Sequence, residues 1–443
     1  MKHLPYPKYK NSSVDWIGEI PQSWAIEKLK YAANIFASNV DKKTIEGQSL
    51  VNLCNYTDVY YNEMIESEMD FMVASATDEQ IDKFSLKKND VIITKDSETP
   101  DDIGIAAYVL EDIPGVICGY HLSMIRPKNS NSGAFIKRLF DSHYVKNKFE
   151  TLANGVTRYG LGSYVIKNLH IPLPPYEEQK DIVNFLDHET AKIDELIQKQ
   201  QRLIELIIEK RISCITNAVT GGFNKKGKFK KTGIDWLNIL PDHWLFRKLS
   251  SLTSKIGDGL HGTPEYVDLS NIHFINGTNL REGSIFITES TRCINSLEAQ
   301  KYKIELNEST VLMSINGTIG NLALYKGESI VLGKSAAYIN AGDLLSREYL
   351  YYYLQSSPIS HFYDLSVTGS TISNLSLETI RNTYIALPPM DEQVEIVKYL
   401  TSRLAKIDEL LVRSSRSIEL LKEHRATLIS AAVTGKIDVR ESV

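Results

Sequence analysis

The sequence has few cysteines, no long apolar run and no excess of basic residues. Its four cysteines are scattered among 443 residues and form no C-x-x-C pair, which argues against a disulfide framework or a zinc site and favours a reducing compartment. No run of about 18 apolar residues is present, so we expect no membrane span. The first residues lack the apolar core of a signal peptide, and we therefore expect a cytoplasmic protein.

The formal net charge is −5, which weakens a nucleic-acid interpretation because phosphates attract basic residues. The charge is uneven, however. The stretch from Glu63 to Asp82 has seven acids and no base, whereas Lys225–Lys231 has five lysines. We expect the acidic stretch to face away from DNA, toward a partner. We interpret the lysine-rich run as a solvated inter-domain linker, with a DNA clamp as the alternative. The folded distribution of charge therefore decides.

Catalytic and metal-binding motifs are also missing. Gly327 and Gly333-Lys334-Ser335 are separated by five residues, whereas a phosphate-binding loop has four. Gly160-x-Gly162 lacks the rest of a dinucleotide fingerprint. The histidines form no H-x-x-x-H arrangement, and no convincing nuclease cluster of carboxylates is present. We therefore predict neither a catalytic residue nor a metal ligand.

The chain contains an internal repeat instead. Three segments recur 214 residues later: Ile171–Gln179 as Ile385–Gln393, Ala191–Leu196 as Ala405–Leu410, and Ala218–Gly221 as Ala432–Gly435. An opening segment, Val14–Trp24, recurs as Ile234–Trp244. A repeat this long indicates a duplicated domain pair, and we expect a frame with pseudo-twofold symmetry. The four tryptophans lie in the two openings, where we expect them to be packing anchors.

The middle of each copy has the pattern of a mixed α/β (α+β) domain. Short β-rich runs at 91–94 and 310–313 are bounded by Gly, Asn and Asp. Helical patterns follow at 134–150 and 346–355.

A long helix is predicted after each Leu-Pro-Pro, because proline suits the start of a helix and is excluded from its interior. Apolar residues then follow a heptad pattern over five heptads, which predicts a two-helix antiparallel coiled coil about 50 Å long. Two separate amphipathic helices are the alternative. Gln200 and Ser414 would face each other near the centre. The predicted core positions are Ile193, Ile197, Gln200, Ile204, Ile207, Ile407, Leu411, Ser414, Ile418 and Leu421.

These motifs resemble the specificity subunits of type I restriction-modification systems. The resemblance is carried by the Trp-x-x-x-x-Pro-x-x-Trp openings, the Leu-Pro-Pro-x-x-Glu-Gln helix starts, the Lys-Ile-Asp-Glu-Leu segments and the Ala-Val-Thr-Gly ends. It implies two target-recognition domains separated by the coiled coil. The expected divisions are a first recognition domain, 1–175; a first helix, 176–220; a linker and second recognition domain, 221–389; and a second helix with a tail, 390–443.

The resemblance further implies a non-catalytic subunit that binds a bipartite site on double-stranded DNA. Its expected partners are two methyltransferase subunits and restriction or translocase subunits, and it has no membrane partner. S-adenosylmethionine, ATP and magnesium belong to the partner subunits, and this chain is expected to bind no cofactor. The alternatives are an enzyme acting alone and a coiled-coil decoy of the same shape without DNA readout.

Candidate DNA contacts are polar or aromatic side chains in Gly-rich or loop segments, because base edges and phosphates are bound by such groups. Gly262-Thr263-Pro264 and Gly317–Gly320 match loops that the family places in its recognition domains. The candidates are Lys95, Ser97, Tyr120, His121, Arg158 and Tyr159 in the first domain, and His261, Thr263, Asn279, Arg281, Asn316, Thr318, Lys334 and Thr371 in the second.

Overall fold

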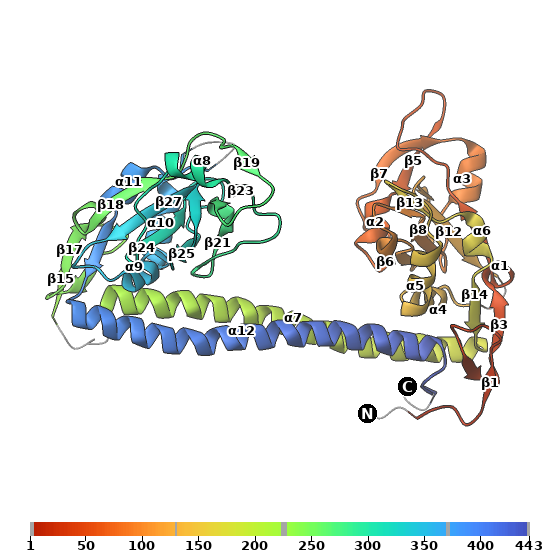
Figure 1. Ribbon diagram of the computed structural model, residues 1–443. Coiled ribbons are helices and arrows are strands. Elements are labelled where there is room, and N and C mark those ends of the chain that lie inside the picture. The colour runs from red at the N-terminus through yellow and green to blue at the C-terminus, as the bar shows by residue number, and fades with distance from the viewer. Residues whose placement is uncertain (1–3, 129–130, 223–227, 369–372, 441–443) are drawn as a thin grey trace. The chain divides into compact units, whose positions relative to one another are not determined.

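The computed structural model describes residues 4–128, 131–222, 228–368 and 373–440 (Figure 1). The chain divides into two compact units, one of Met1–Gln200 with Arg416–Val443 and one of Gln201–Ser415. Each unit contains one mixed α/β domain and one part of each long helix, α7 (Tyr176–Gly221) and α12 (Met390–Val433). The predicted mixed α/β architecture is confirmed.

The first unit is built on a five-stranded sheet in the order β4-β12-β8-β10-β6. Its neighbours are antiparallel except β10 and β6, which are parallel. A three-stranded sheet, β11-β5-β7, adjoins it. The strands of the two sheets are β4 (Ala33–Ala37), β5 (Ser49–Cys54), β6 (Met64–Ile65), β7 (Met72–Ala76), β8 (Val91–Thr94), β10 (Ala106–Val109), β11 (Val116–Cys118) and β12 (Leu122–Pro127).

Shorter elements complete this unit. The strands are β1 (Tyr9–Asn11), β2 (Glu19–Pro21), β3 (Ala25–Lys28), β9 (Asp96–Ser97), β13 (Tyr159–Gly160) and β14 (His170–Leu173). The helices are α1 (Leu29–Ala32), α2 (Tyr56–Tyr60), α3 (Asp78–Phe84), α4 (Gly133–Phe140), α5 (His143–Leu152) and α6 (Ser163–Lys167), with a 3-10 turn at Pro100–Asp102.

The second unit repeats this plan with a four-stranded antiparallel sheet, β18-β27-β24-β25, and a smaller sheet, β19-β23-β20-β26. Its strands are β15 (Phe229–Lys231), β16 (Ile239–Pro241), β17 (Leu245–Lys248), β18 (Thr253–Asp258), β19 (Tyr266–Val267), β20 (His273–Ile275), β21 (Leu280–Arg281), β22 (Ser284–Ile285), β23 (Cys293–Ile294), β24 (Thr310–Ser314), β25 (Leu322–Leu324), β26 (Ile330–Leu332), β27 (Ala336–Ala341) and β28 (Tyr384–Leu387). Its helices are α8 (Ser296–Lys301), α9 (Arg347–Leu354), α10 (Ser357–Ser366) and α11 (Leu377–Asn382), with 3-10 turns at Leu249–Ser251 and Gly277–Asn279.

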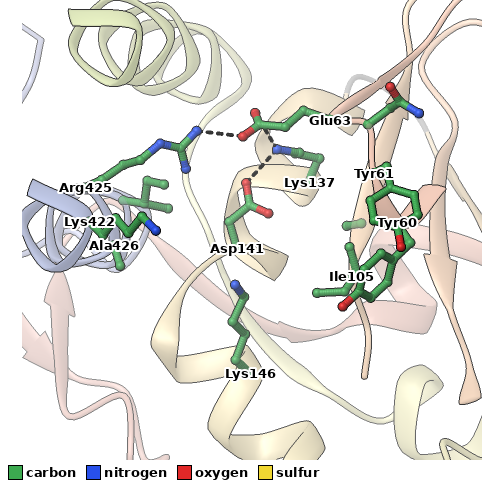
Figure 2. A pocket seen from close by; sticks show the side chains of 13 residues that line it. Tyr60, Tyr61, Glu63, Ile105, Lys137, Asp141, Lys146, Lys422, Arg425 and Ala426 are labelled. Atoms are coloured by element: carbon green, nitrogen blue, oxygen red, sulfur yellow. Dashed lines mark hydrogen bonds and ion pairs between the residues drawn. The ribbon is translucent and has the colours of Figure 1, made fainter. Parts of the chain in front are cut away.

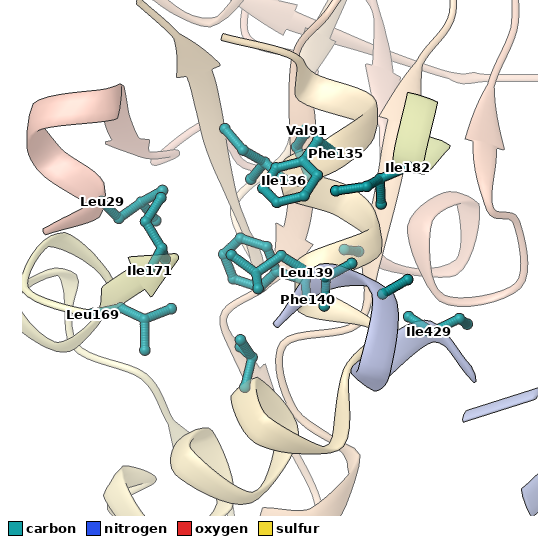
Figure 3. Close-up of a cluster of buried hydrophobic side chains, with 14 of the residues drawn as sticks. Leu29, Val91, Phe135, Ile136, Leu139, Phe140, Leu169, Ile171, Ile182 and Ile429 are labelled. Carbon is teal, nitrogen blue, oxygen red and sulfur yellow. The ribbon is translucent and has the colours of Figure 1, made fainter. Parts of the chain in front are cut away.

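The main core of the first unit lies where α4 meets the two long helices. Phe135, Ile136 and Leu139 of α4 are fully buried, and they form one cluster with Ile182 of α7 and Ile429 of α12 (Figure 3). Burial of each such side chain contributes about 1.5–3 kcal/mol. The α/β domain of this unit is therefore attached to its helices by a continuous apolar core.

The repeated Trp and Glu-Gln motifs have one structural role in both units. The Trp24 indole donates to Glu178 (Nε1–Oε1 2.9 Å), and the Trp244 indole donates to Glu392 (Nε1–Oε2 3.0 Å). Both rings are fully buried, where an indole N–H needs a partner. The prediction that the tryptophans are packing anchors is confirmed for these two. Trp16 and Trp236 stack at the surface of their units on Tyr144 and Phe362, respectively.

The glutamine of each motif joins a long helix to the domain beside it. Gln179 donates to Pro174 O (2.9 Å) and accepts from the backbone N–H of Ser132 (2.9 Å), the N-cap of α4. Gln393 makes the equivalent bonds with Pro388 O (3.0 Å) and Ser346 N (2.8 Å), the N-cap of α9. Both glutamine side chains are buried, where polar groups need hydrogen-bond partners. Their bonds hold the long helix against the N-terminus of α4 or α9, which explains why the motif recurs.

The long helices bear matched ion pairs. In the first unit the Arg425 guanidinium donates to Asp194 (Nε–Oδ1 2.9 Å). In the second unit Arg211 donates to Asp408 (Nε–Oδ1 3.1 Å). Both pairs join α7 to α12 within a unit, and their residues are related by the same 214-residue shift.

The predicted core positions of the helices are all buried or half-buried. Ile193, Ile407 and Ser414 are buried, and the other positions are half-buried: Ile197, Gln200, Ile204, Ile207, Leu411, Ile418 and Leu421. Gln200 and Ser414 belong to different units, so their pairing stays a prediction.

One detail of the sequence interpretation is wrong. In the described part of the lysine-rich run, Phe229–Lys231 form β15 and pair with β16, so this part is not a solvated linker. The Lys230 ammonium donates to Asp242 O (2.7 Å), which holds it against the second unit.

An ionic cluster lies between the domain and the helices of the first unit (Figure 2). Glu63 accepts from Lys137 (2.9 Å), Arg138 (3.1 Å) and Arg425 (2.6 Å), while Arg138 also donates to Asp187 (2.7 Å). Burial raises the pKa of Glu63, but the three cations outweigh burial and lower the pKa to about 2. Glu63 is thus engaged inside its own unit, whereas the other acids of the stretch are exposed, and their orientation relative to DNA or a partner stays a prediction.

Candidate nucleic-acid interface

The structure brings together the three candidate segments of the first unit. The strand β9 pairs with β13, which places Ser97 opposite Tyr159. The backbone of Lys95 accepts from Leu161 N (2.8 Å) and donates to His121 O (3.0 Å). Segments 95–97, 120–121 and 158–160 therefore meet beyond the end of β8, although more than 60 residues separate the first from the last.

Asp96 is at the centre of this group of side chains. One carboxylate oxygen contacts His121 (Oδ2–Nδ1 2.9 Å), and the other accepts from Arg158 (Oδ1–Nη2 2.7 Å). Arg158 Nη2 also lies 3.3 Å from His121 Nδ1. The guanidinium is the outermost group, since 54% of the Arg158 side chain is exposed, against 17% for Asp96 and 26% for His121. We call Asp96, His121 and Arg158 the acidic-brace cluster.

The other candidates of this unit differ in accessibility. The Lys95 ammonium donates to Ser38 O (2.8 Å) and lies 4.5 Å from the centroid of the Tyr120 ring. Burial lowers the pKa of Lys95, and Tyr120 is half exposed. Ser97 is buried and Tyr159 packs against the core, so both are better placed to support the surface than to contact a ligand.

In the second unit, four candidate segments meet at Gly333–Ala336. The backbone N–H of Leu260 donates to Leu332 O (2.7 Å), and Ile315 N donates to Ser335 O (2.9 Å). Gly277 N donates to Ser335 Oγ (2.9 Å). A Cβ at Gly277 would lie 2.8 Å from Ser335 O. The glycine therefore allows the close approach of these loops.

The side chains of this second group are mostly accessible. Thr263, Arg281, Thr318 and Lys334 are exposed, and Asn316 is half-buried. His261 is exposed and contacts Asp258 (Nε2–Oδ2 2.7 Å). The Arg281 guanidinium lies 5.5 Å from the Phe286 ring centroid. Thr371 lies outside the described residues.

Asn279 has a structural partner on both sides of its amide. Its side chain accepts from Asn276 N (2.9 Å) and donates to Phe286 O (3.1 Å), which holds the turn together. Beside it is an open cavity of ≈ 350 Å³. The cavity is lined by Asn279 and Arg281 together with Arg292, Thr278 and Phe286, and this combination of donors and aromatic faces suits a nucleic acid.

The two candidate surfaces occupy equivalent places in the repeat. Lys95 O accepts from Leu161 N (2.8 Å), and Ile315 O accepts from Leu375 N (2.8 Å). Asp96 opposes Gly160, and Asn316 opposes Asn374. Asp96 was missed as a site residue because a search for phosphate-binding groups passes over carboxylates. Asp96 could have been found from the sequence, because it lies between the candidate residues Lys95 and Ser97.

The described residues contain no helix with the length and apolarity to cross a membrane. Nor do they bring three or more His, Cys, Asp or Glu side chains together in a way that could hold a metal ion.

Each of the two α/β units thus carries a candidate surface of hydrogen-bond donors and acceptors. The chain belongs to the family described as the type I restriction modification DNA specificity domain, whose model matches residues 24–206 and 265–419. The resemblance inferred from the repeated motifs is thereby confirmed. A specificity subunit recognises DNA sequence and is non-catalytic, since catalysis resides in partner subunits.

Relatives match over most of their length. The chain is 23% identical to the putative type I restriction enzyme MjaX specificity subunit of Methanocaldococcus jannaschii, over 99% of each chain. It is 21% identical to the type I restriction enzyme EcoKI specificity subunit of Escherichia coli, over 80% of this chain and 75% of the relative.

Two solved structures show the same fold. The HsdS subunit from Thermoanaerobacter tengcongensis has a TM-score of 0.53 and 18% identity, with 94% of this chain and 98% of that subunit covered. A chain from a structural study of complex assembly and conformational transition in a type I restriction-modification system has a TM-score of 0.72 and 19% identity, with 94% of this chain and 99% of that chain covered.

Proposed function

We propose that this chain reads a bipartite, asymmetric DNA site, with one half-site bound by each α/β domain. The observation that carries this proposal is the equivalent placement of the two candidate surfaces, which the sequence repeat alone did not give. Their chemistry differs, because the first presents the acidic-brace cluster and the second presents Asn316, Thr318 and Lys334. Different donors and acceptors select different base edges, so the two half-sites should differ.

The domain divisions follow from this function. The first target-recognition domain corresponds to residues 1–175 and the second, with its preceding linker, to 221–389. The helices 176–220 and 390–443 (with the tail) form one antiparallel coiled coil between them. The matched Arg–Asp pairs within the two units support a pseudo-twofold frame.

The helices also serve as a scaffold for two methyltransferase subunits, alongside restriction subunits. Exposed apolar side chains remain on the helices, and such groups favour a protein partner. Among them are Leu196, Leu203, Leu206, Ile208 and Ile212 on α7, and Leu410, Val412 and Leu420 on α12. S-adenosylmethionine, ATP and magnesium would be bound by the partners.

The decisive experiment is reconstitution with a methyltransferase subunit, followed by sequencing of methylated adenines. We expect one motif with two specified halves and an unspecified spacer. Methylation without any specified motif would instead support a decoy of the same shape, and methylation by the isolated chain would support an enzyme.

The length of the coiled coil should set the spacer. Insertion of four residues into each helix adds about 6 Å, or about two base pairs. We expect the methylated motif to keep both halves and to gain spacer positions. An unchanged spacer in a folded variant would contradict this function of the helices.

A further inference from the structure

The acidic-brace cluster contains an arginine that is oriented but not fully used. Its contacts with Asp96 and His121 both involve Nη2. Among the described residues, no hydrogen-bond acceptor is recorded for Arg158 Nε or Nη1, and more than half of the side chain is exposed. Nη2 is therefore held by the protein, while Nε and Nη1 remain available to an acceptor outside the chain.

The charge of Asp96 also affects which ligand Arg158 can bind. Asp96 carries a charge that repels phosphate, and its ion pair offsets the charge of Arg158. A phosphate contact would gain more from an arginine without such a neighbour. A base edge is polar but uncharged, so binding to it depends more on the orientation of the hydrogen-bond donors than on the net charge of the site.

His121 strengthens the brace from the other side. Its Nδ1 is closer to Asp96 Oδ2 (2.9 Å) than to Arg158 Nη2 (3.3 Å), so the ring nitrogen donates to the carboxylate. The adjacent Tyr120 ring packs edge-on against His121 at 4.9 Å. Asp96 is thus held by a histidine while its other oxygen holds the arginine, and the three side chains lock one another.

We propose that Arg158 is a specificity-determining residue that contacts a guanine in the half-site read by the first unit, with Asp96 and His121 as positioning residues. A guanidinium can donate two parallel hydrogen bonds to guanine O6 and N7 in the major groove, a pattern that no other base offers. The second unit has Asn316 in the position of Asp96 and lacks the carboxylate of this brace. The inference rests on the proposed function, because it requires that the first unit reads DNA.

The test uses the reconstituted methyltransferase complex with the wild-type chain and the variants Arg158→Ala, Asp96→Asn and Lys83→Ala. Lys83 is an exposed lysine of α3 in the same unit, and its removal controls for the loss of one positive charge. Methylated sites are sequenced, and binding to duplexes with each base pair substituted is measured at several salt concentrations.

We expect the wild-type motif to contain a G·C pair at which Arg158→Ala loses about 10- to 100-fold in discrimination, as for one bidentate contact. Asp96→Asn should lose part of this discrimination at the same base pair, while binding to non-specific DNA becomes no weaker, because a charge that repels phosphate is removed. Lys83→Ala should keep the complete motif.

Three results would overturn the inference while leaving the proposed function intact. The first is a wild-type half-site without a G·C pair that responds to Arg158→Ala. The second is an Arg158→Ala variant that keeps the motif and reduces binding to all sequences with a lower salt dependence, as expected for a phosphate contact. The third is an equal effect of Lys83→Ala. A wild-type complex without any specified half-site would instead contradict the proposed function itself.

Discussion

The two units attach their α/β domains to the long helices with different chemistry at equivalent positions. In the first unit Lys137 and Arg138 of α4 form the ionic cluster with Glu63, Asp187 and Arg425. The residues that follow these two by 214 positions are Tyr351 and Tyr352 of α9. A junction of charges in one unit thus corresponds to a junction of tyrosines in the other.

The remaining partners differ in the same sense. Tyr352 Oη lies 3.2 Å from Thr401 Oγ1, where the first unit has Arg138 and Asp187. Gly283 O accepts from Leu324 N, as Glu63 O accepts from Tyr108 N (3.0 Å in both). A Cβ at Gly283 would lie 2.9 Å from Tyr351 Oη, so the tyrosine has taken the space of the glutamate side chain.

The comparison shows which contacts are common to the two units and which differ. The Trp–Glu hydrogen bond, the glutamine that bonds a long helix to the N-cap of α4 or α9, and the Arg–Asp pair between α7 and α12 are present in both units. The surface where domain meets helix is free to be ionic or aromatic, provided that its volume is filled. An open cavity lies beside each junction, of ≈ 340 Å³ in the first unit and ≈ 820 Å³ in the second.

The largest effect should come from the part that the units share. Trp24→Ala and Trp244→Ala each empty a fully buried site and remove one hydrogen-bond partner of a glutamate. We expect each to lower the free energy of unfolding of its unit by about 3–5 kcal/mol. Thermal unfolding, with hydrogen exchange to locate the affected unit, measures this. Loss of stability in only one of the two variants would show that the frame is not equivalent in the two units.

Substitutions at the two junctions should have a smaller effect on stability, through charge in the first unit and through apolar burial in the second. Arg138→Ala removes a buried guanidinium from several carboxylates, two of which are about half exposed. We expect a loss of about 2 kcal/mol, because solvent screens part of the cost of unpaired charge. Tyr352→Ala should cost about 1–2 kcal/mol through lost apolar burial.

Salt distinguishes the two kinds of junction. The destabilisation caused by Arg138→Ala should become smaller as the salt concentration is raised from about 0.05 M to about 1 M. At about 1 M the Debye length is about 3 Å, so ion pairs in the exposed parts of the cluster are screened. The effect of Tyr352→Ala should not shrink. Tyr352→Phe is the control, since it keeps the ring and loses only the contact with Thr401. Equal salt responses would remove the distinction drawn between the junctions.

The sequence predicted the elements of this molecule better than the contacts between them. Pro-Pro before a heptad pattern predicted the starts of α7 and α12. Short β-rich runs predicted the positions of β8 and β24. Local patterns carry these features because they depend on neighbouring residues. The meeting of segments 95–97, 120–121 and 158–160 could be anticipated only as a set of polar loops, since strand pairing decides which loops meet.

The ionic cluster shows where prediction from sequence ended. Glu63 and Arg425 are 362 residues apart, and no local pattern relates them. Because Glu63 opens an acidic stretch, its surroundings in sequence suggested an exposed face toward a partner. Its surroundings in space are three cations. Asp96 presents the same difficulty, since a carboxylate beside a DNA surface is meaningful only once its arginine is known.

The smallest expected effect concerns the pH dependence of the ionic junction. The pKa of Glu63 is lowered from 4.5 to about 2 in the folded chain. A carboxyl whose pKa is depressed by folding stabilises the protein above its unfolded pKa, and this contribution is lost as the pH falls towards the folded value. Glu63→Gln should therefore destabilise the first unit at pH 7 by about 1 kcal/mol, a figure reduced because the side chain is half exposed.

The difference between the wild-type chain and Glu63→Gln should then narrow from about pH 4.5 towards pH 2, as the wild-type carboxyl becomes protonated. Thermal unfolding across this range measures the difference, and carboxyl groups common to both chains cancel. Glu66→Gln is a matched control, because Glu66 is an exposed residue close to Glu63 in sequence. A difference that stays constant from pH 7 to pH 3 would mean that the Glu63 charge does not stabilise the junction. The ionic cluster would then contribute by packing, as the tyrosines of the second unit do.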